Sequence, residues 1–113
     1  MNYKIATTDD FERNFKRLYK KYRSLKQDLA DLVKDLRKNP TLGDDLGSNT
    51  RKVRMMISSK NKGKSGGARI ITCNVLIDIK NTKIFLLTIY DKGEQESISQ
   101  AEIEHLKAIN GLI

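Results

Sequence analysis

The order in which strands and helices are predicted along the chain, β-α-α-β-β-β-α, favours an α+β domain. Three observations give this order: two helical stripes of apolar residues within residues 9–39, three strand-like runs between residues 52 and 90, and a helix-capping box formed by Ser99 and Glu102. The 113 residues are enough for one hydrophobic core and too few for two domains. Residues 1–113 are therefore expected to form a single domain.

The N-terminal part of the chain predicts a short strand and a pair of helices. Residues 2–6 alternate in polarity as a strand does, and Thr8 follows as a suitable helix cap. Apolar residues then recur at i, i+4, i+7, i+8 and i+11, first from Phe11 and again from Leu25, which is the spacing of one buried helix face. The second stripe stops before the only proline, Pro40. The two helices are expected to form an αα-hairpin.

The remainder of the chain predicts three strands and a final helix. Residues 40–50 are rich in Gly, Asp and Ser and are expected to form a loop. Residues 84–89 are apolar on both alternating faces, so their strand is expected to be covered on both sides and to lie centrally in the sheet. The capping box predicts a helix that ends near Gly111. The three strands are expected at residues 52–57, 68–77 and 83–90.

The chain is basic, with 22 Lys and Arg against 14 Asp and Glu and a formal net charge of +8. Residues 51–69 contain seven of these cations and no acidic residue. Such a stretch favours a polyanion, nucleic acid in particular, as the partner. No apolar run approaches the ~20 residues of a membrane span, and the N-terminus lacks the layout of a secretory signal. A cytoplasmic protein without membrane contact is therefore expected.

Several kinds of site are disfavoured by the composition. The single cysteine, Cys73, and the single histidine, His105, provide neither a disulfide framework nor a set of zinc ligands. Residues 63–65 (Gly-Lys-Ser) resemble the end of a nucleotide-binding loop, but Ser58 stands where that loop needs glycine and a strand follows in place of a helix. No metal site and no cofactor are expected.

A cluster of cations is predicted on one face of the sheet. Alternation along the strand at residues 52–57 places Lys52 and Arg54 on one face and Val53 on the other. If this strand pairs antiparallel with the next one, Arg69 joins them. Cations so clustered can bind a phosphate and stabilise the charge that builds on a phosphate under attack. The alternative is a solvated edge of an antiparallel sheet.

The groups that would transfer protons are left open among several candidates. His105 carries the only side chain that titrates near neutral pH in ordinary surroundings, but it lies within a helix, where surface histidines are common. Tyr90 ends the central strand, where a phenol can work or simply pack. Lysines would act as bases only if neighbouring cations favoured their neutral form. The lysines in question are Lys52 and three in a basic loop suited to contact an RNA backbone, Lys60, Lys62 and Lys64.

Three segments, taken in order, resemble a known family. They are Lys52-Val53-Arg54, residues 66–71 (GGARII) and residues 84–94 (IFLLTIYDKGE). With the order of elements, they resemble the RelE/ParE superfamily of bacterial type II toxin-antitoxin toxins, and within it the HigB-like and RelE-like branch, over nearly the whole chain. The resemblance implies a small antiparallel sheet with the helical hairpin on one face and a short C-terminal helix.

The resemblance also implies an activity. Many members are metal-independent endoribonucleases, or mRNA interferases, that cleave mRNA on the ribosome and so inhibit translation. In that reaction the ribose 2′-hydroxyl attacks the adjacent phosphate while cations stabilise the transition state. The implied partners are a cognate antitoxin that covers the basic patch, mRNA on the ribosome, and operator DNA bound by the toxin-antitoxin complex.

Roles for individual residues follow from the same resemblance. Lys52 and Arg54 are implied to bind phosphate or transfer protons, Arg69 to stabilise the transition state, and Lys92 to add a cation. Tyr90 is a further catalytic candidate. The RNA-binding residues are expected to be Arg51, Lys60, Lys62 and Lys64.

Two alternative functions are left open. The first alternative is a binding protein without nuclease activity. It is either a DNA gyrase inhibitor, as some members of the superfamily are, or an inert RNA-binding domain. A degenerate toxin that only holds its antitoxin is the second alternative. Likeness of fold alone does not distinguish these functions.

Overall fold

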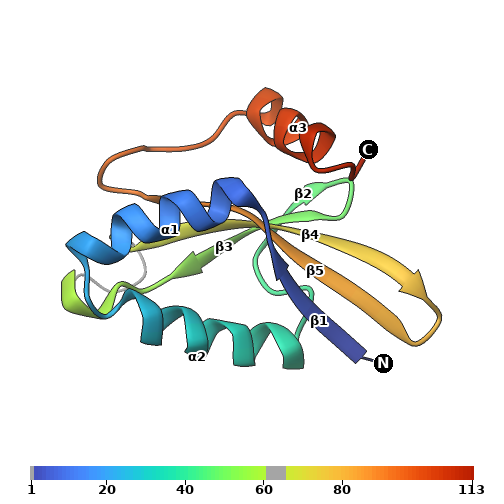
Figure 1. Ribbon diagram of the computed structural model, residues 1–113, viewed down its shortest axis with the longest axis horizontal. Helices are drawn as coiled ribbons and strands as arrows, with labels where there is room; N and C mark the ends of the chain where they lie inside the picture. Colours follow the sequence, from blue (N-terminus) through green and yellow to red (C-terminus); the bar gives the residue numbers. More distant parts are fainter. Residues whose placement is uncertain (1, 61–65) are drawn as a thin grey trace.

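The computed structural model describes residues 2–60 and 66–113, and within them one five-stranded sheet is flanked by three helices (Figure 1). The strands lie in the order β1-β5-β4-β3-β2 across the sheet. The predicted α+β class and the predicted order of the helices are confirmed. The strands are β1 (Asn2–Thr7), β2 (Asp44–Gly47), β3 (Thr50–Met55), β4 (Ala68–Asp78) and β5 (Asn81–Asp91); the helices are α1 (Asp9–Lys21), α2 (Leu25–Lys38) and α3 (Gln100–Ile109), with a 3₁₀ turn, η1, at Ser58–Lys60.

The helices α1 and α3 begin at the caps that the sequence provides. The Thr8 hydroxyl accepts a hydrogen bond from the N–H of Phe11, at 3.1 Å, and the Ser99 hydroxyl accepts one from the N–H of Glu102, at 3.1 Å. α1 also has acidic residues in its first turn and lysines in its last, which the helix dipole favours. Local side-chain chemistry therefore sets where these helices start.

The helices bury two separate cores on opposite faces of the sheet. α1 and α2 pack on one face and α3 packs on the other. β5 contributes to both, with Leu86 in the first core and Leu87 in the second, which confirms the predicted central strand that is covered on both sides. The cores include Phe11, Leu18, Leu36, Val53 and Ile70 on the side of α1 and α2, and Ile71, Cys73 and Ile103 on the side of α3.

Two features of the sheet differ from the expectation. β2 lies within residues 40–50, predicted as a loop, because its Asp-Asp-Leu-Gly sequence has no alternating apolar pattern and becomes a strand only by pairing with β3. β1 pairs parallel with β5, so the sheet is mixed and not purely antiparallel. Parallel neighbours need a long crossover connection, and residues 8–80 lie between these two strands.

A β-bulge interrupts the pairing of β4 with β5. Ile71 pairs with Thr88, but the next residue, Thr72, pairs with Leu86. Leu87 is therefore the extra residue on β5. A bulge of this kind reverses the alternation of side chains that follow it.

The bulge determines which way the end of β5 points. Ile89 lies in the core under α1 and α2, and Asp91 is hydrogen-bonded to Tyr22 at the end of α1, so Tyr90 between them faces the opposite side of the sheet. The Thr8 hydroxyl donates to the carbonyl oxygen of Leu87, at 2.7 Å, and so ties the start of α1 to the bulge. Without the bulge, Tyr90 would face the helices.

Candidate functional site

Four of the predicted catalytic residues lie on the face of the sheet opposite α1 and α2. Arg54 of β3 pairs with Arg69 of β4, which in turn pairs with Tyr90 of β5. Directly paired residues point to the same face, and Lys52, two residues before Arg54, shares it. The antiparallel register thus places Arg69 beside Lys52 and Arg54, as the alternation predicted. We call Lys52, Arg54, Arg69 and Tyr90 the basic face.

The basic face combines two accessible cations with two side chains that are almost completely buried. Arg54 is exposed and Lys52 is half-buried, whereas Arg69 is only 3% exposed and Tyr90 only 5%. One guanidinium nitrogen of Arg69 donates to the carbonyl oxygen of Ala68, at 3.2 Å. Arg54 and Arg69 are directly paired across two strands, and like charges in such positions are unfavourable. A pair of this kind is suited to hold an anion, which relieves the repulsion.

The phenol of Tyr90 is held in its neutral form. Burial raises the pKa of Tyr90 above its ordinary value of 10.0, and the positive charge of Arg69 offsets only part of this effect. A neutral phenol is an O–H donor. Next to a buried guanidinium, it can donate a hydrogen bond or a proton to an oxygen on which negative charge develops.

Lys92 lies where β5 passes into a turn. Its N–H donates to the carbonyl oxygen of Gly67, at 3.1 Å, which extends the pairing of β4 and β5 by one residue. Lys92 thus lies directly after β5, two residues beyond Tyr90. Gly67 itself lies so close to β3 that a Cβ there would overlap the carbonyl oxygen of Met55. Glycine is therefore required where β4 begins.

Arg51, a predicted RNA-binding residue, lies outside the basic face. It precedes Lys52, so alternation turns it to the side of α1 and α2. Its guanidinium donates to the carbonyl oxygens of Thr41, at 3.0 Å, and Gly43, at 3.3 Å, and lies 3.7 Å from a carboxylate oxygen of Asp45. Arg51 thus holds the segment between α2 and β2.

Lys60, another predicted RNA-binding residue, is bound within the protein. Its ammonium group donates to a carboxylate oxygen of Asp91, at 2.7 Å, and to the carbonyl oxygen of Gly66, at 3.0 Å. Its side chain is 13% exposed and that of Asp91 is 1% exposed. This ammonium is therefore held by internal partners, and its contact with RNA stays a prediction. Lys62 and Lys64 lie outside the described residues.

The ion pair of Lys60 and Asp91 shifts both groups toward their charged forms. For Asp91, burial acts to raise the pKa, but the hydrogen bonds from Lys60, from the Gly93 N–H and from Tyr22 together outweigh it, and the pKa lies below its ordinary value of 3.8. The hydrogen bond to Asp91 raises the pKa of Lys60 above 10.5, against the opposing effect of burial. The pair is therefore ionised throughout the neutral range.

His105 lines the same cavity as Tyr90. This cavity, of about 410 Å³, lies between α1, the end of β5 and α3. His105 is on its α3 wall, and Asn14 of α1 donates to the hydroxyl of Thr88, at 3.3 Å, on the opposite wall. The fold thus brings the only histidine close to the basic face, a proximity that its position in the sequence does not reveal.

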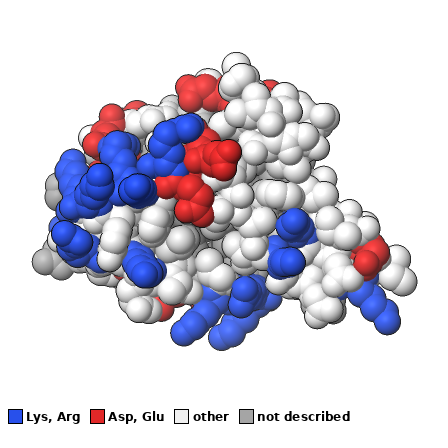
Figure 2. All heavy atoms as spheres, viewed as in Figure 1, with Lys and Arg blue, Asp and Glu red and all other residues white. Residues whose placement is uncertain are grey.

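Further cations lie on the surface of α1, on the other side of the sheet from the basic face. Figure 2 shows Lys and Arg gathered over the side of the molecule where α1 lies. They come from the exposed stripe of α1, opposite its buried stripe. The cations along α1 are Arg13, Lys16, Arg17, Lys20 and Lys21.

Asp91 and Tyr22 were not predicted as partners of Lys60. The Tyr22 hydroxyl donates to the second carboxylate oxygen of Asp91, at 2.9 Å. The only signal for Asp91 was an acidic residue directly after an apolar strand, followed by Gly93. Tyr22 looked like the last member of an apolar helix stripe, and nothing in its spacing indicated a polar partner.

A comparison with protein families bears on the chain as a whole. The model of the family described as the RelE toxin of the RelE/RelB toxin-antitoxin system matches residues 11–113. That family implies a RelB-type antitoxin as partner. In the described part of the chain, no helix has the length and apolar character needed to span a bilayer. The match runs from Phe11 in α1 to the end of the chain and includes every residue of the basic face, and the chain therefore belongs to the RelE family of type II toxin-antitoxin toxins.

Proposed function

We propose that this chain cleaves mRNA on the ribosome as a metal-independent endoribonuclease and thereby inhibits translation. The observation that carries the proposal is the basic face, where two paired arginines, a lysine and a neutral phenol meet on adjacent strands. Membership in the RelE toxin family supports the same activity. The cations of α1 add a surface that attracts RNA.

In the proposed reaction, the 2′-hydroxyl attacks the neighbouring phosphorus and the bond to the 5′-oxygen breaks. The products are a 2′,3′-cyclic phosphate and a 5′-hydroxyl. Negative charge grows on the phosphate oxygens in the transition state, where Arg69 and Arg54 stabilise it through paired N–H donors. Lys92 binds a neighbouring phosphate.

Lys52 and Tyr90, the remaining residues of the basic face, assist the two proton transfers. The Lys52 ammonium stabilises the 2′-oxygen as its proton leaves. The neutral phenol of Tyr90 protonates the departing 5′-oxygen. The proton of the 2′-hydroxyl passes to water, and the phenolate left on Tyr90 takes a proton back from water, so the protein ends the reaction in its starting state.

The proposal is tested by inducing the chain alone in bacterial cells and mapping the 5′ ends of mRNA across the transcriptome. The variant is Arg69→Ala, and the matched control is Arg37→Ala, an exposed arginine of α2. We expect cuts within translated codons for the wild type and Arg37→Ala, and none for Arg69→Ala. Growth arrest without cuts would contradict the proposal and favour gyrase, and absence of arrest would favour a role confined to the antitoxin.

A further inference from the structure

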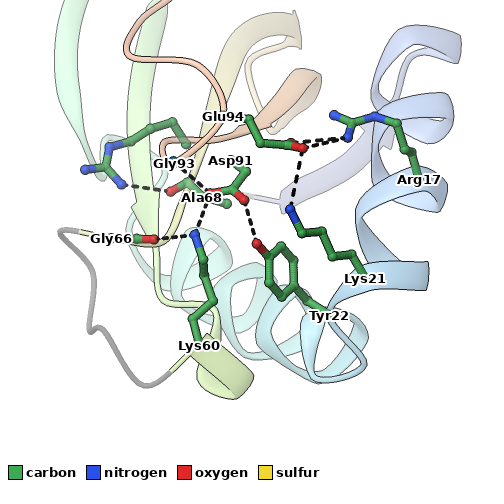
Figure 3. Close-up of polar contacts among 10 residues, drawn as sticks. Arg17, Lys21, Tyr22, Lys60, Gly66, Ala68, Asp91, Gly93 and Glu94 are labelled. Atoms are coloured by element: carbon green, nitrogen blue, oxygen red, sulfur yellow. Dashed lines mark hydrogen bonds and ion pairs between the residues drawn. The ribbon is translucent and has the colours of Figure 1, made fainter.

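A buried ion pair lies beneath the end of the basic face and takes no part in the proposed chemistry. Lys60 and Asp91 are 2.7 Å apart, with side chains 13% and 1% exposed (Figure 3). Neither points toward the basic face, because the bulge turns Asp91 to the side of α1. The pair nevertheless adjoins the basic face along the chain, because Asp91 directly follows Tyr90.

Both oxygens of the Asp91 carboxylate accept hydrogen bonds. One accepts from Lys60 and also from the N–H of Gly93, at 2.9 Å, and the other accepts from the Tyr22 hydroxyl, at 2.9 Å. The Lys60 ammonium lies 5.2 Å from the centre of the Tyr22 ring, within the range of a cation–π contact. We call these contacts, with that of Lys60 to the carbonyl of Gly66, the Lys60 network.

The Lys60 network joins four separate segments of the chain. Tyr22 stands at the end of α1, Lys60 in η1, Gly66 just before β4, and Asp91 at the end of β5. Gly66 lies three residues before Arg69, and Asp91 lies between Tyr90 and Lys92. The network therefore fixes the ends of the two strands that carry the buried half of the basic face.

An ion pair of this kind is a poor device for stability alone. Removing two charges from water is costly, and apolar residues of similar size often stabilise a fold as well or better. What charged hydrogen bonds supply is a fixed geometry, because their directions and lengths are restricted. If Asp91 is held toward α1, alternation holds Tyr90 toward the basic face.

We propose that the Lys60 network positions Tyr90 and Arg69 for mRNA cleavage, with Lys60, Asp91 and Tyr22 as positioning residues that do not touch the RNA. This inference rests on the proposed endoribonuclease function. It predicts that loss of the network lowers the rate of the bond-breaking step and leaves binding to the ribosome intact.

The test measures single-turnover cleavage of ribosome-bound mRNA by the purified chain, as a maximal rate and as the concentration of protein that gives half of it. Lys60→Met with Asp91→Leu replaces the pair by apolar residues and leaves no buried charge behind. We expect its maximal rate to fall by about 10- to 100-fold, the size of effect that displacement of reacting groups by ~1 Å produces. The half-saturating concentration should stay within about twofold, because the exposed cations that bind RNA remain.

Three further variants separate positioning from general stability. Glu94→Gln breaks the exposed pairs from α1 to the turn after β5, with Arg17 at 3.2 Å and Lys21 at 3.7 Å (Figure 3), and should cleave at the wild-type rate. Leu32→Ala weakens the core under α2 without touching Asp91 and should also cleave normally while folded. Tyr22→Phe removes one hydrogen bond and should give a smaller loss of rate than the double variant.

The outcomes distinguish this inference from the proposed function. A folded double variant that cleaves at the wild-type rate would overturn the positioning role and leave the endoribonuclease standing. The same holds if Leu32→Ala loses as much activity as the double variant, since stability would then explain both. A wild-type chain that does not cleave would overturn the proposed function and, with it, the inference that depends on it.

Discussion

The pairing of Arg54 with Arg69 is expected to favour activity and to lower the stability of the fold. Arg54 and Arg69 are directly paired, and the second is almost completely buried. Their repulsion is an unfavourable contribution to the folded state in the absence of an anion. A substitution that removes the charge of Arg54 is therefore expected to change activity and stability in opposite directions.

We expect Arg54→Gln to stabilise the free protein and to slow mRNA cleavage. The substitution removes the charge of the exposed arginine and leaves that of the buried one. It should raise the free energy of unfolding by about 0.2–1 kcal/mol, the range for cross-strand pairs. Chemical denaturation at low salt measures the first effect, and single-turnover cleavage measures the second. Arg37→Gln on α2 is the control and should change neither. A destabilised Arg54→Gln would show that the two guanidinium groups do not repel each other in the fold.

The ion pair of Lys60 and Asp91 makes stability depend on pH in a stated direction. The pKa of Asp91 is lowered, so its contribution is present above its ordinary pKa of 3.8 and is lost as pH falls through the lower folded value. The pKa of Lys60 is raised, so its contribution is present below 10.5 and is lost as pH rises through the higher folded value. The pair thus supports the fold fully between these limits.

We expect Asp91→Asn to be less stable than the wild type at neutral pH and to lose less stability on acidification. The measurement is the free energy of unfolding by urea between pH 2 and pH 7. Glu94→Gln, which removes exposed ion pairs in the same region, should follow the wild-type curve closely because such pairs contribute ~0–1 kcal/mol. Parallel curves for the wild type and Asp91→Asn would mean that Asp91 does not titrate differently on folding.

At the residue level, the sequence was informative where a side chain lies on a regular strand. Lys52, Arg54 and Arg69 were brought together by alternation and pairing, both of which are readable from the sequence. Arg51 and Lys60 have partners that the sequence did not indicate, loop carbonyls for Arg51 and a distant carboxylate for Lys60. A basic residue is drawn to whatever acceptor the fold brings near, and sequence spacing does not report that acceptor.

Among the elements, β4 depends on one glycine at its start. A Cβ on Gly67 would overlap the carbonyl oxygen of Met55, which belongs to the neighbouring strand and cannot move freely. Gly47, by contrast, has a φ of +84° and no atom near the position of its Cβ. The two glycines thus serve close approach in one case and backbone conformation in the other.

We expect Gly67→Ala to destabilise the protein more than Gly47→Ala. Forcing a methyl group into a filled space costs about 1–3 kcal/mol, and at Gly67 the obstacle is backbone that cannot give way. The left-handed backbone at Gly47 costs an alanine about 1–2 kcal/mol, with no steric overlap added. Thermal unfolding of both variants measures the difference. Gly67→Ala should also lower cleavage, because Lys92 is held by the carbonyl of Gly67. Equal decreases in stability would indicate that β3 and β4 separate easily at this point.

The elements that the sequence predicted are those with local signals. α1 and α3 have caps and stripes within a few residues, and β5 has a long apolar run. Three other features depend on strands elsewhere in the chain. They are β2, the parallel pairing of β1 with β5, and the bulge at Leu87. The bulge matters most for the site, since strict alternation along the apolar run would have placed Tyr90 on the wrong face.

Over the whole molecule, Lys and Arg gather on the side where α1 lies (Figure 2), and a positive surface of this kind would attract the RNA that the proposed function requires. The cavity that Tyr90 lines has Arg17 of α1 on its wall, so the two groups of cations are neighbours. Binding by many phosphate contacts is strongly dependent on salt. The contribution of α1 can therefore be measured apart from catalysis.

We expect Lys16→Gln with Lys20→Gln to weaken binding to the ribosome without changing the maximal cleavage rate. The slope of log affinity against log salt should become less steep by about 2, roughly one for each lysine that no longer binds a phosphate. Lys26→Gln with Lys34→Gln, two lysines of α2, is the matched control and should leave the slope unchanged. An equal effect of the two pairs would mean that net charge alone, without a preferred face, sets the binding.

The parallel pairing of β1 with β5 also has a consequence in time. A chain is synthesised from its N-terminus, so β1 waits without its partner until residues 81–86 have been made. Tyr90 and Lys92 come still later, and pairings between distant parts of a chain form slowly. The basic face is thus assembled only once its last strand, β5, has been made, and a chain that stops before β5 lacks the site that the proposed cleavage of mRNA requires.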